Sequence, residues 1–111
     1  MKILSEKLSR SALKSSNFAM GGEMVKAVVD IDRNLLAIDA ELHADLEKLL
    51  LENGSDQFSL WGINLYFDGD LIEFDSMINI RPAQGNRSRD VENEATRTAI
   101  VNVVNNWITD D

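Results

Sequence analysis

Two segments of this chain alternate apolar and polar residues with the period of two that a half-buried β-strand requires. The first covers about 24–42 and turns at Arg33-Asn34, where asparagine tolerates a positive φ. The second covers about 60–80 and turns at Asp68-Gly69, a pair typical of two-residue hairpins. We therefore predict two antiparallel β-hairpins, the second ending before Pro82 because proline has no amide hydrogen to donate.

Helical patterns surround these hairpins. Ser9 can cap a helix over about 9–19, and leucines at helical spacing indicate a helix over about 44–53 that stops at Gly54. An apolar stripe predicts a last helix over about 91–108, made by Val91, Ala95, Ala99, Ile100, Val103, Val104 and Trp107. The order helix, hairpin, helix, hairpin, helix predicts an α+β fold, an antiparallel sheet packed against helices in one domain, 1–111.

Composition restricts the kinds of partner. The 19 acidic and 11 basic residues give a formal net charge of −8, which argues against binding a nucleic-acid backbone. The absence of cysteine excludes disulfides, thiolate nucleophiles and cysteine metal ligands. No apolar run approaches the ~20 residues of a membrane span, and the N-terminus becomes charged too early for a secretory signal. We expect a cytoplasmic protein without a cofactor.

One segment resembles a calcium-binding loop. Asp30, Asp32, Asn34 and Glu41 match the oxygen-ligand positions one, three, five and twelve of an EF-hand. The sixth position requires glycine for its sharp turn and here holds Leu35, and the flanking segments alternate as strands. The sequence therefore favours a hairpin with acidic residues beside its turn, and we predict no metal site.

Glu41 and His43 are the candidate catalytic residues. On a strand they point to the same face, so the carboxylate can orient the imidazole for general acid–base work. Asp45 is expected in the first turn of the following helix, where its charge suits the helix dipole. The alternative is structural: His43 bonds a backbone group and Glu41 is solvated. Because the chain has one histidine, a multi-histidine metal site within one subunit is excluded.

The second hairpin has one predicted face of polar residues. Its last strand is expected to bury Ile72, Phe74, Ser76, Ile78 and Ile80 and to expose Glu73, Asp75, Met77, Asn79 and Arg81. Asn64 and Tyr66 stand across from this polar set, and Lys26, Asp30, Glu41 and His43 join it if both hairpins share one sheet. Such a face can bind a polar ligand, or it can be an ordinary solvated surface.

The segment before the last helix concentrates positive charge. Ser88 or Asp90 can cap that helix, leaving amides free for an anion, and Arg87 or Arg89 can add bidentate contacts. The alternative is a capped loop whose arginines pair with carboxylates. The candidate ligand-binding residues, for a small anionic ligand, are Asn79, Arg81, Asn86, Arg87, Ser88 and Arg89.

Four sequence words carry a resemblance to known proteins. They are Val25–Ile31, Glu41–Asp45 (ELHAD), Trp61–Tyr66 (WGINLY) and Phe74–Arg89 (FDSMINIRPAQGNRSR). Together they resemble a family of small uncharacterised prokaryotic proteins of unknown function. The chain departs at Ile38-Asp39-Ala40, where a glycine-rich segment is expected. The resemblance implies no activity, so it transfers no functional residue.

Two classes of function remain open. The favoured one is a non-enzymatic ligand-binding or assembly module that acts as a homodimer, because Val28 and Leu35 put apolar side chains on the outer face of the first hairpin. The alternative is a small hydrolase or lyase that uses His43 and Glu41 with an anion held at Arg81 or Arg87. This alternative requires His43 and Arg87 to lie close together.

Overall fold

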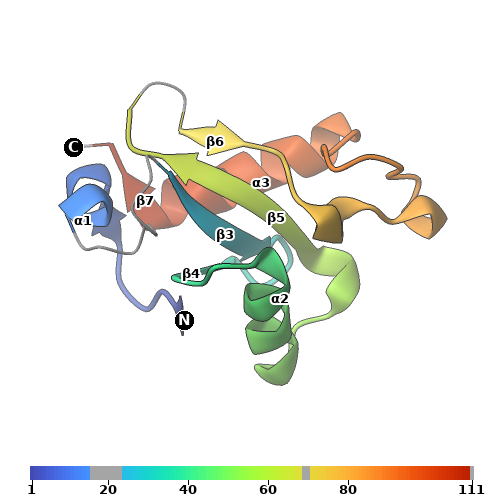
Figure 1. Cartoon of the computed structure of the whole chain (residues 1–111), viewed down its shortest axis with the longest axis horizontal. Helices are drawn as coiled ribbons and strands as arrows, with labels where there is room; N and C mark the ends of the chain where they lie inside the picture. The colour runs from blue at the N-terminus through green and yellow to red at the C-terminus, as the bar shows by residue number, and fades with distance from the viewer. Residues whose placement is uncertain (16–23, 69–70, 111) are drawn as a thin grey trace.

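The computed structural model describes residues 1–15, 24–68 and 71–110, with a five-stranded antiparallel sheet at its centre (Figure 1). The strand order is β1-β4-β3-β5-β6. The strands are β1 (Lys2–Ile3), β3 (Met24–Asp30), β4 (Leu35–Ile38), β5 (Leu60–Tyr66) and β6 (Ile72–Glu73). Because β3 pairs with both β4 and β5, the two predicted hairpins are neighbours in one sheet. The α+β class predicted from the sequence is confirmed.

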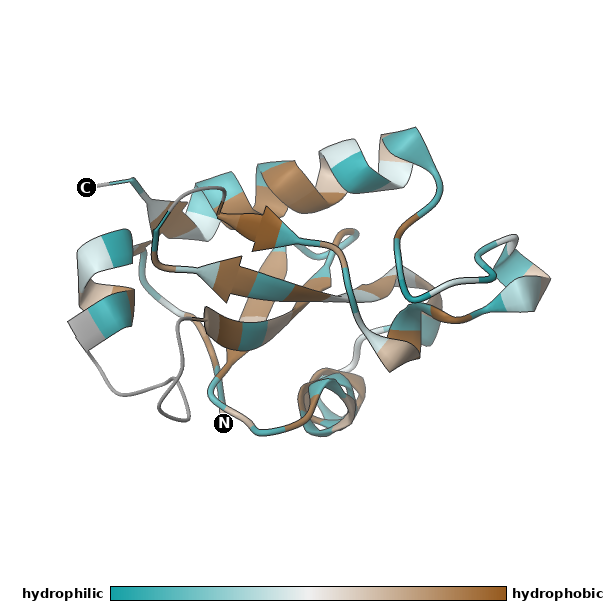
Figure 2. Ribbon diagram, turned by 45° about the horizontal axis from the view of Figure 1, so that its top comes forward, coloured by the Kyte–Doolittle hydropathy of each residue, from teal (hydrophilic) through white to brown (hydrophobic). Residues whose placement is uncertain are grey.

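Helices lie on both faces of this sheet (Figure 2). Helix α3 (Glu94–Trp107) covers one face, where Ile100, Val103 and Val104 join the larger hydrophobic cluster. Helix α2 (His43–Glu52) covers part of the other. The short α1 (Arg10–Ser15) follows β2 (Leu8–Ser9), which pairs in parallel with β7 (Ile108–Thr109). Within the described ranges, no helix has the length and apolar character needed to cross a bilayer.

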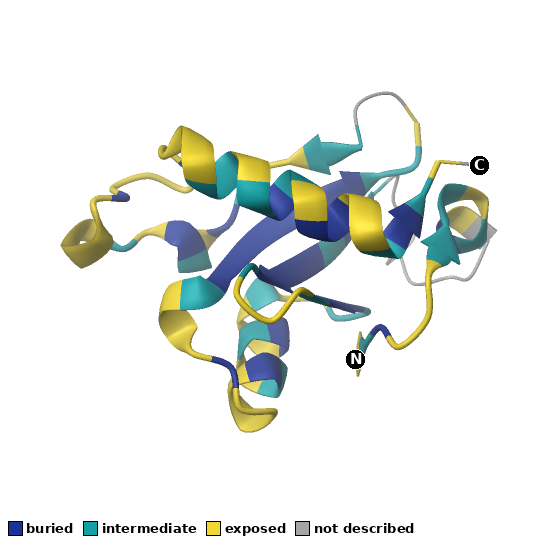
Figure 3. Cartoon of the chain, turned by 180° about the vertical axis from the view of Figure 1, so that it is seen from behind, coloured by how far each residue is buried: buried dark blue, intermediate teal, exposed yellow. Residues whose placement is uncertain are grey.

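The strand β3 is buried on both faces. Val25, Ala27 and Val29 pack on the α3 side, while Val28 belongs to a second cluster with Leu46 and Leu50 of α2. Figure 3 shows the central strands buried beneath α3, whose outer surface stays exposed. Val28 is therefore covered by the chain's own helix, and Leu35 packs against the same cluster, which removes the reason for expecting a homodimer. The homodimer itself stays a prediction.

The first hairpin is shorter than predicted. Its turn includes the predicted Arg33-Asn34, with Asn34 at a positive φ of 55°, but it spans residues 31–34, because β3 ends at Asp30, which pairs with Leu35. The return strand was expected to reach Leu42, but β4 ends at Ile38 because Asp39 adopts a φ of 73° and turns the backbone out of the sheet. Ala40 is half-buried and Leu42 is exposed, so the prediction that Leu42 is buried is wrong.

The predicted register of the second hairpin is confirmed, but the predicted length of its second strand is wrong. Asn64 pairs with Glu73 and Leu65 with Ile72, the register that a two-residue Asp68-Gly69 connection requires; Gly69 itself lies outside the described residues. The partner strand was predicted to continue to Ile80, but β6 ends at Glu73. Two short 3₁₀ helices follow, η2 (Met77–Asn79) and η3 (Pro82–Gln84).

The end of β6 has a local cause. The Ser76 hydroxyl accepts a hydrogen bond from the Ile78 amide and caps η2, which offers the backbone an alternative to strand pairing. This turn reverses the predicted alternation: Asn79 is fully buried, whereas Ile80 is 39% exposed. The prediction that Asn79 is exposed and Ile80 buried is therefore wrong.

The helix ends follow their capping residues. The Ser9 hydroxyl accepts from the Ala12 amide at 2.9 Å, which confirms Ser9 as the cap of α1; residues 16–19 and Gly21-Gly22 lie outside the described ranges. Helix α2 begins at His43, one residue before the predicted start. Helix α3 begins at Glu94 instead of Val91, because its cap is Asn93, not Ser88 or Asp90.

Glycine is required at position 62 by a close approach. A Cβ at Gly62 would lie 2.5 Å from both Cβ and Oγ of Ser76 and 3.1 Å from Cγ1 of Ile78. We expect Gly62→Ala to lower the free energy of unfolding by about 1–3 kcal/mol, the usual result of overpacking. Urea denaturation measures this change.

A double-mutant cycle with Ser76→Gly is the control. Because Ser76→Gly removes the two atoms that the new methyl group approaches most closely, Gly62→Ala should be less damaging in that background. Equal losses in the two backgrounds would contradict the steric explanation.

Candidate functional site

A row of polar side chains crosses three strands on the sheet face that α2 only partly covers. Lys26 of β3 pairs with Asn64 of β5, and Asn64 pairs with Glu73 of β6. Residues paired across antiparallel strands project to the same face, as the sequence predicted for these three. Asn64 Nδ2 donates to Glu73 Oε1 at 2.8 Å, and the Tyr66 hydroxyl lies 3.1 Å from the same oxygen. The far end of this row is therefore fixed by hydrogen bonds.

His43 is the first residue of α2 and lies above this row. Its Nε2 lies 2.8 Å from the carbonyl oxygen of Ile63 in β5. Because a carbonyl only accepts, Nε2 carries the proton, and Nδ1 of the neutral ring is left as an acceptor. Leu42, which precedes the helix, provides no side-chain cap. The imidazole thus attaches the N-terminal end of α2 to the sheet.

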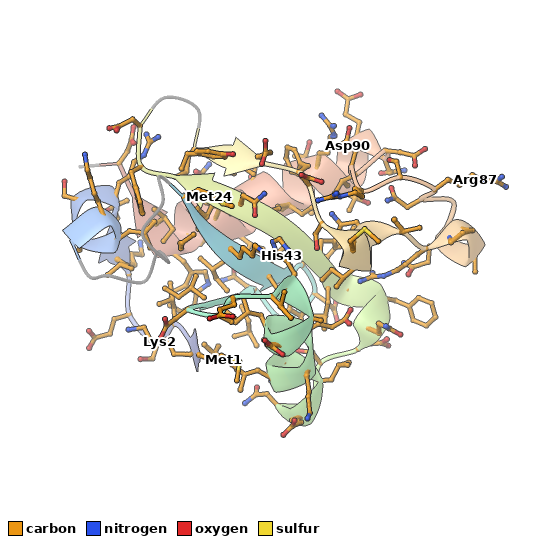
Figure 4. All side chains as sticks on the ribbon, viewed as in Figure 1. Met1, Lys2, Met24, His43, Arg87 and Asp90 are labelled. Atoms are coloured by element: carbon orange, nitrogen blue, oxygen red, sulfur yellow. The ribbon has the colours of Figure 1, made fainter. Side chains whose placement is uncertain are left out.

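These residues surround a pocket of about 410 Å³, called here the His43 pocket. It lies between α2, the sheet and the segment after β6. Its lining residues are Met24, Lys26, Leu42, His43, Ala44, Asn64, Glu73, Asp75, Ser76, Met77, Ile78 and Arg89. Figure 4 shows His43 at the sheet-facing end of α2. Arg89 Nε pairs with Asp75 Oδ1 at 2.8 Å, which ties the loop before α3 to the pocket rim.

The environment of His43 favours its neutral form. Burial lowers the pKa of His43, and the nearby Lys26 ammonium lowers it further. The hydrogen bond to the Ile63 carbonyl, the Asn64 side chain and the Asp75 carboxylate act in the opposite direction, but the net shift is downward. Near neutral pH the pocket therefore holds an uncharged imidazole beside a charged lysine.

Asn64 has one unsatisfied atom. The residue is 5% exposed, and its Nδ2 is bonded, but no described group meets full hydrogen-bond geometry at its buried Oδ1, although the Asn64 side chain is close enough to the His43 ring to raise the pKa of His43. A buried acceptor without a donor costs about 1–3 kcal/mol, so it commonly marks a place where a further group binds.

The predicted pairing of Glu41 with His43 is wrong. The prediction placed both on one strand, but β4 ends at Ile38 and His43 belongs to a helix. Glu41 is exposed in the connection between them. Asp45 lies in the first turn of α2, as expected. The groups that influence the ring are instead Lys26, Asn64 and Asp75, none of which is near His43 in sequence.

Three candidate ligand-binding residues have structural partners. Asn79 bonds both backbone groups of Gly62: its Oδ1 accepts from the amide at 2.8 Å, and its Nδ2 donates to the carbonyl at 2.9 Å. Asn86 Nδ2 donates to the carbonyls of Asn79, Ser88 and Asp90, and its Oδ1 accepts from the Glu92 amide. Arg81 stacks 4.8 Å from the centre of the Trp61 ring and bonds the Leu60 carbonyl and Glu47. These side chains hold the loop in place.

The backbone amides that were expected to bind an anionic ligand are bound by a carboxylate of the chain itself. The amides of Arg87 and Ser88 donate to Oε2 of Glu92 at 2.6 and 3.0 Å, and the Ser88 hydroxyl adds a third bond at 3.1 Å. The Arg87 amide is the largest cause of the lowered pKa of Glu92. Figure 4 shows Arg87 on the outlying loop, well away from His43. Of the loop residues predicted to bind a ligand, Arg89 alone lines the His43 pocket.

The acidic residues of the first turn also have a local role. Asp30 is buried, and its Oδ1 accepts from the amides of Asp32 and Arg33 at 2.9 Å. Asp30, the first residue of the segment that resembled a calcium loop, thus stabilises the turn with its side chain. In the described part of the chain, no three acidic or histidine side chains are grouped as metal ligands would be.

Sequence reasoning missed the apolar part of the pocket. Met24, Leu42 and Met77 line it, and Leu42 and Met77 are 55% and 65% exposed. The sequence signal for this apolar wall was weak. Leu42 was predicted to be a buried residue of the return strand, whereas the backbone leaves that strand at Asp39.

The fold and the pocket define a small α+β protein with a partly polar hollow on one sheet face. The chain belongs to the family DUF5674, described as a protein of unknown function, whose model matches residues 2–107. The resemblance to an uncharacterised family is thus confirmed. No curated protein and no solved structure matches the chain.

The lowered pKa of His43 predicts a pH dependence of stability. Below about pH 6.5, the ordinary value, the unfolded chain takes up the proton before the folded chain does, so stability is lost as the pH falls through that region. His43→Gln removes this effect and retains a donor for the Ile63 carbonyl. The excess stability of the wild type over His43→Gln should therefore shrink between pH 7 and pH 5.5 in urea denaturation. An excess that grows on acidification would contradict the direction of the shift.

A second prediction concerns Asn79. Asn79→Leu keeps a similar volume but leaves the amide and carbonyl of Gly62 buried without partners. Each such group costs about 1–3 kcal/mol, so we expect a loss of several kcal/mol in urea denaturation. Asn105→Leu, an exposed asparagine on α3, is the matched control and should stay within about 0.5 kcal/mol of wild type. Equal losses of stability in the two variants would show that the hydrogen bonds from Asn79 to Gly62 do not stabilise the edge of the sheet.

Proposed function

We propose that this protein is a non-enzymatic module that binds a small polar ligand in the His43 pocket. One observation carries the proposal: besides the buried Ser76, six polar side chains from five segments of the chain converge on one hollow of about 410 Å³. They are Lys26, His43, Asn64, Glu73, Asp75 and Arg89. The volume is within the range of about 300–1,000 Å³ typical of small-molecule sites.

The fixed geometry of these side chains supports binding over an ordinary solvated surface. Glu73 is held by Asn64 and Tyr66, Asp75 by Arg89, and His43 by the Ile63 carbonyl. Side chains already fixed lose less conformational entropy when a ligand binds, which favours affinity. The unsatisfied Oδ1 of Asn64 gives the same face an unused acceptor.

The hydrolase or lyase alternative has less support. It needs Glu41, His43 and an anion at Arg87 or Arg81 to act on one substrate. Glu41 is exposed before α2, Arg87 is on the outlying loop, and the Arg81 guanidinium is engaged with Leu60 and Trp61. These positions favour binding over catalysis by this set of residues.

A fragment screen by nuclear magnetic resonance tests the proposal. Several hundred polar fragments, including carboxylates, amines, amino acids, sugar phosphates and nucleotides, are added to the ¹⁵N-labelled protein. We expect the amide shifts that respond to cluster at residues 24–26, 42–44, 64, 73–77 and 89. A screen without responses, or one whose responses cluster elsewhere, would overturn the proposal.

Variants separate binding at the pocket from binding elsewhere. Lys26→Met removes a charge from the pocket, and Lys48→Met removes one from the exposed surface of α2. A fragment that carries a negative charge and is bound in the His43 pocket should lose affinity in the first variant and keep it in the second.

A further inference from the structure

The charges that line the His43 pocket balance one another. Two are cationic, Lys26 and Arg89, and two are anionic, Glu73 and Asp75, while His43 favours its neutral form. A simple anion in this hollow would meet two carboxylates, and a simple cation would meet two cationic side chains. A ligand that carries one charge of each sign can complement both.

The cationic side of the pocket offers an unpaired charge. Lys26 forms no ion pair with any residue in the described ranges. Beside it is the N-terminal end of α2, where His43 and Ala44 have no side-chain cap and their amides have no intrahelical acceptor. An ammonium and free helix amides together favour a carboxylate.

The opposite side offers acceptors. Glu73 uses Oε1 for Asn64 and Tyr66, and Asp75 uses Oδ1 for Arg89, so each carboxylate has a second oxygen to offer. The unsatisfied Oδ1 of Asn64 lies between Lys26 and Glu73 in the row. Adjacent strands are about 4.8 Å apart, so the backbones of β3 and β6 are separated by roughly 10 Å, a distance that a small molecule and two side chains bridge. These acceptors favour an ammonium.

The remaining wall is apolar and adaptable. Met24, Met77 and Leu42 contribute flexible or exposed hydrophobic side chains next to the charged row. Methionine accommodates different shapes because it is unbranched and has three rotatable bonds. This wall fits a hydrophobic side chain on the ligand.

We infer that the ligand is a small zwitterion of the α-amino-acid type, with its carboxylate toward Lys26 and the N-terminal end of α2, its ammonium toward Glu73 and Asp75, and an apolar side chain against Met24 and Met77. This inference rests on the proposed function and names the ligand class for the same pocket.

Calorimetric titration of the whole chain at pH 7 tests the ligand class. The probes are L-alanine, L-leucine and L-methionine, each with its N-acetyl derivative, which keeps only the carboxylate, and its amide, which keeps only the ammonium. We expect at least one amino acid to bind ten-fold or more tightly than both of its derivatives.

Two variants test which pocket residue recognises the carboxylate of the ligand and which recognises its ammonium. Lys26→Met should abolish the advantage of the amino acid over its amide, because the partner of the carboxylate is lost. Glu73→Gln, which keeps side-chain hydrogen bonding to Asn64 and Tyr66, should reduce its advantage over the N-acetyl derivative. Lys48→Met and Glu52→Gln change the same charges at exposed positions on α2 and should alter neither comparison.

The outcomes distinguish this inference from the proposed function. A derivative that binds as tightly as its amino acid, or fragment hits in the pocket without amino-acid binding, overturns the zwitterion and leaves the binding function in place. If neither the amino acids nor any fragment perturbs the pocket, both proposals fall.

Discussion

The side-chain amide of Asn79 substitutes for a β-strand. It presents one acceptor and one donor to the backbone of Gly62, as a paired strand residue would, and so completes the hydrogen bonding of β5 after β6 has ended. The substitution works because Gly62 has no side chain, which lets Ser76 and Ile78 approach. The chain can therefore leave the sheet after Glu73 without leaving a buried edge unpaired. The segment that turns away forms one wall of the His43 pocket.

The sequence predicted well whatever depends on local pattern. The register of the second hairpin follows from Asp68-Gly69, the turn of the first hairpin includes the expected Asn34, and α2 follows from its leucine spacing and Gly54. It failed where a polar side chain competes with the backbone. Ser76 and Asn79 are buried and bonded, yet they occupy positions that alternate as a strand would. Period-two patterning cannot distinguish an exposed asparagine from one that replaces a ladder bond.

The candidate site was predicted in part for the same reason. Hairpin pairing brought Asn64 and Glu73 together, because that register is a local consequence of the Asp68-Gly69 turn. Lys26 joins them through the pairing of β3 with β5, which no turn determines and which the sequence predicted only on the condition that both hairpins share one sheet. The approach of His43 depends on where β4 ends, and the left-handed Asp39 has no strong sequence signal. The arginine-rich loop was harder still. The sequence gives no indication that Glu92 would bond the Arg87 and Ser88 amides, since that contact depends on the fold of the whole loop.

The row from Lys26 to Glu73 also determines how a ligand bound in the His43 pocket would affect the rest of the sheet. Its three members come from three strands, including β3 at the centre of the sheet, so the row exists only while the sheet is assembled. A ligand that bridges the row acts as a crosslink between distant segments of the chain. Occupancy should therefore slow the cooperative opening of the whole sheet more than the fraying of any single loop, and amide hydrogen exchange would report it also at residues of β3 and β5 that do not line the pocket, such as Val28 and Gly62.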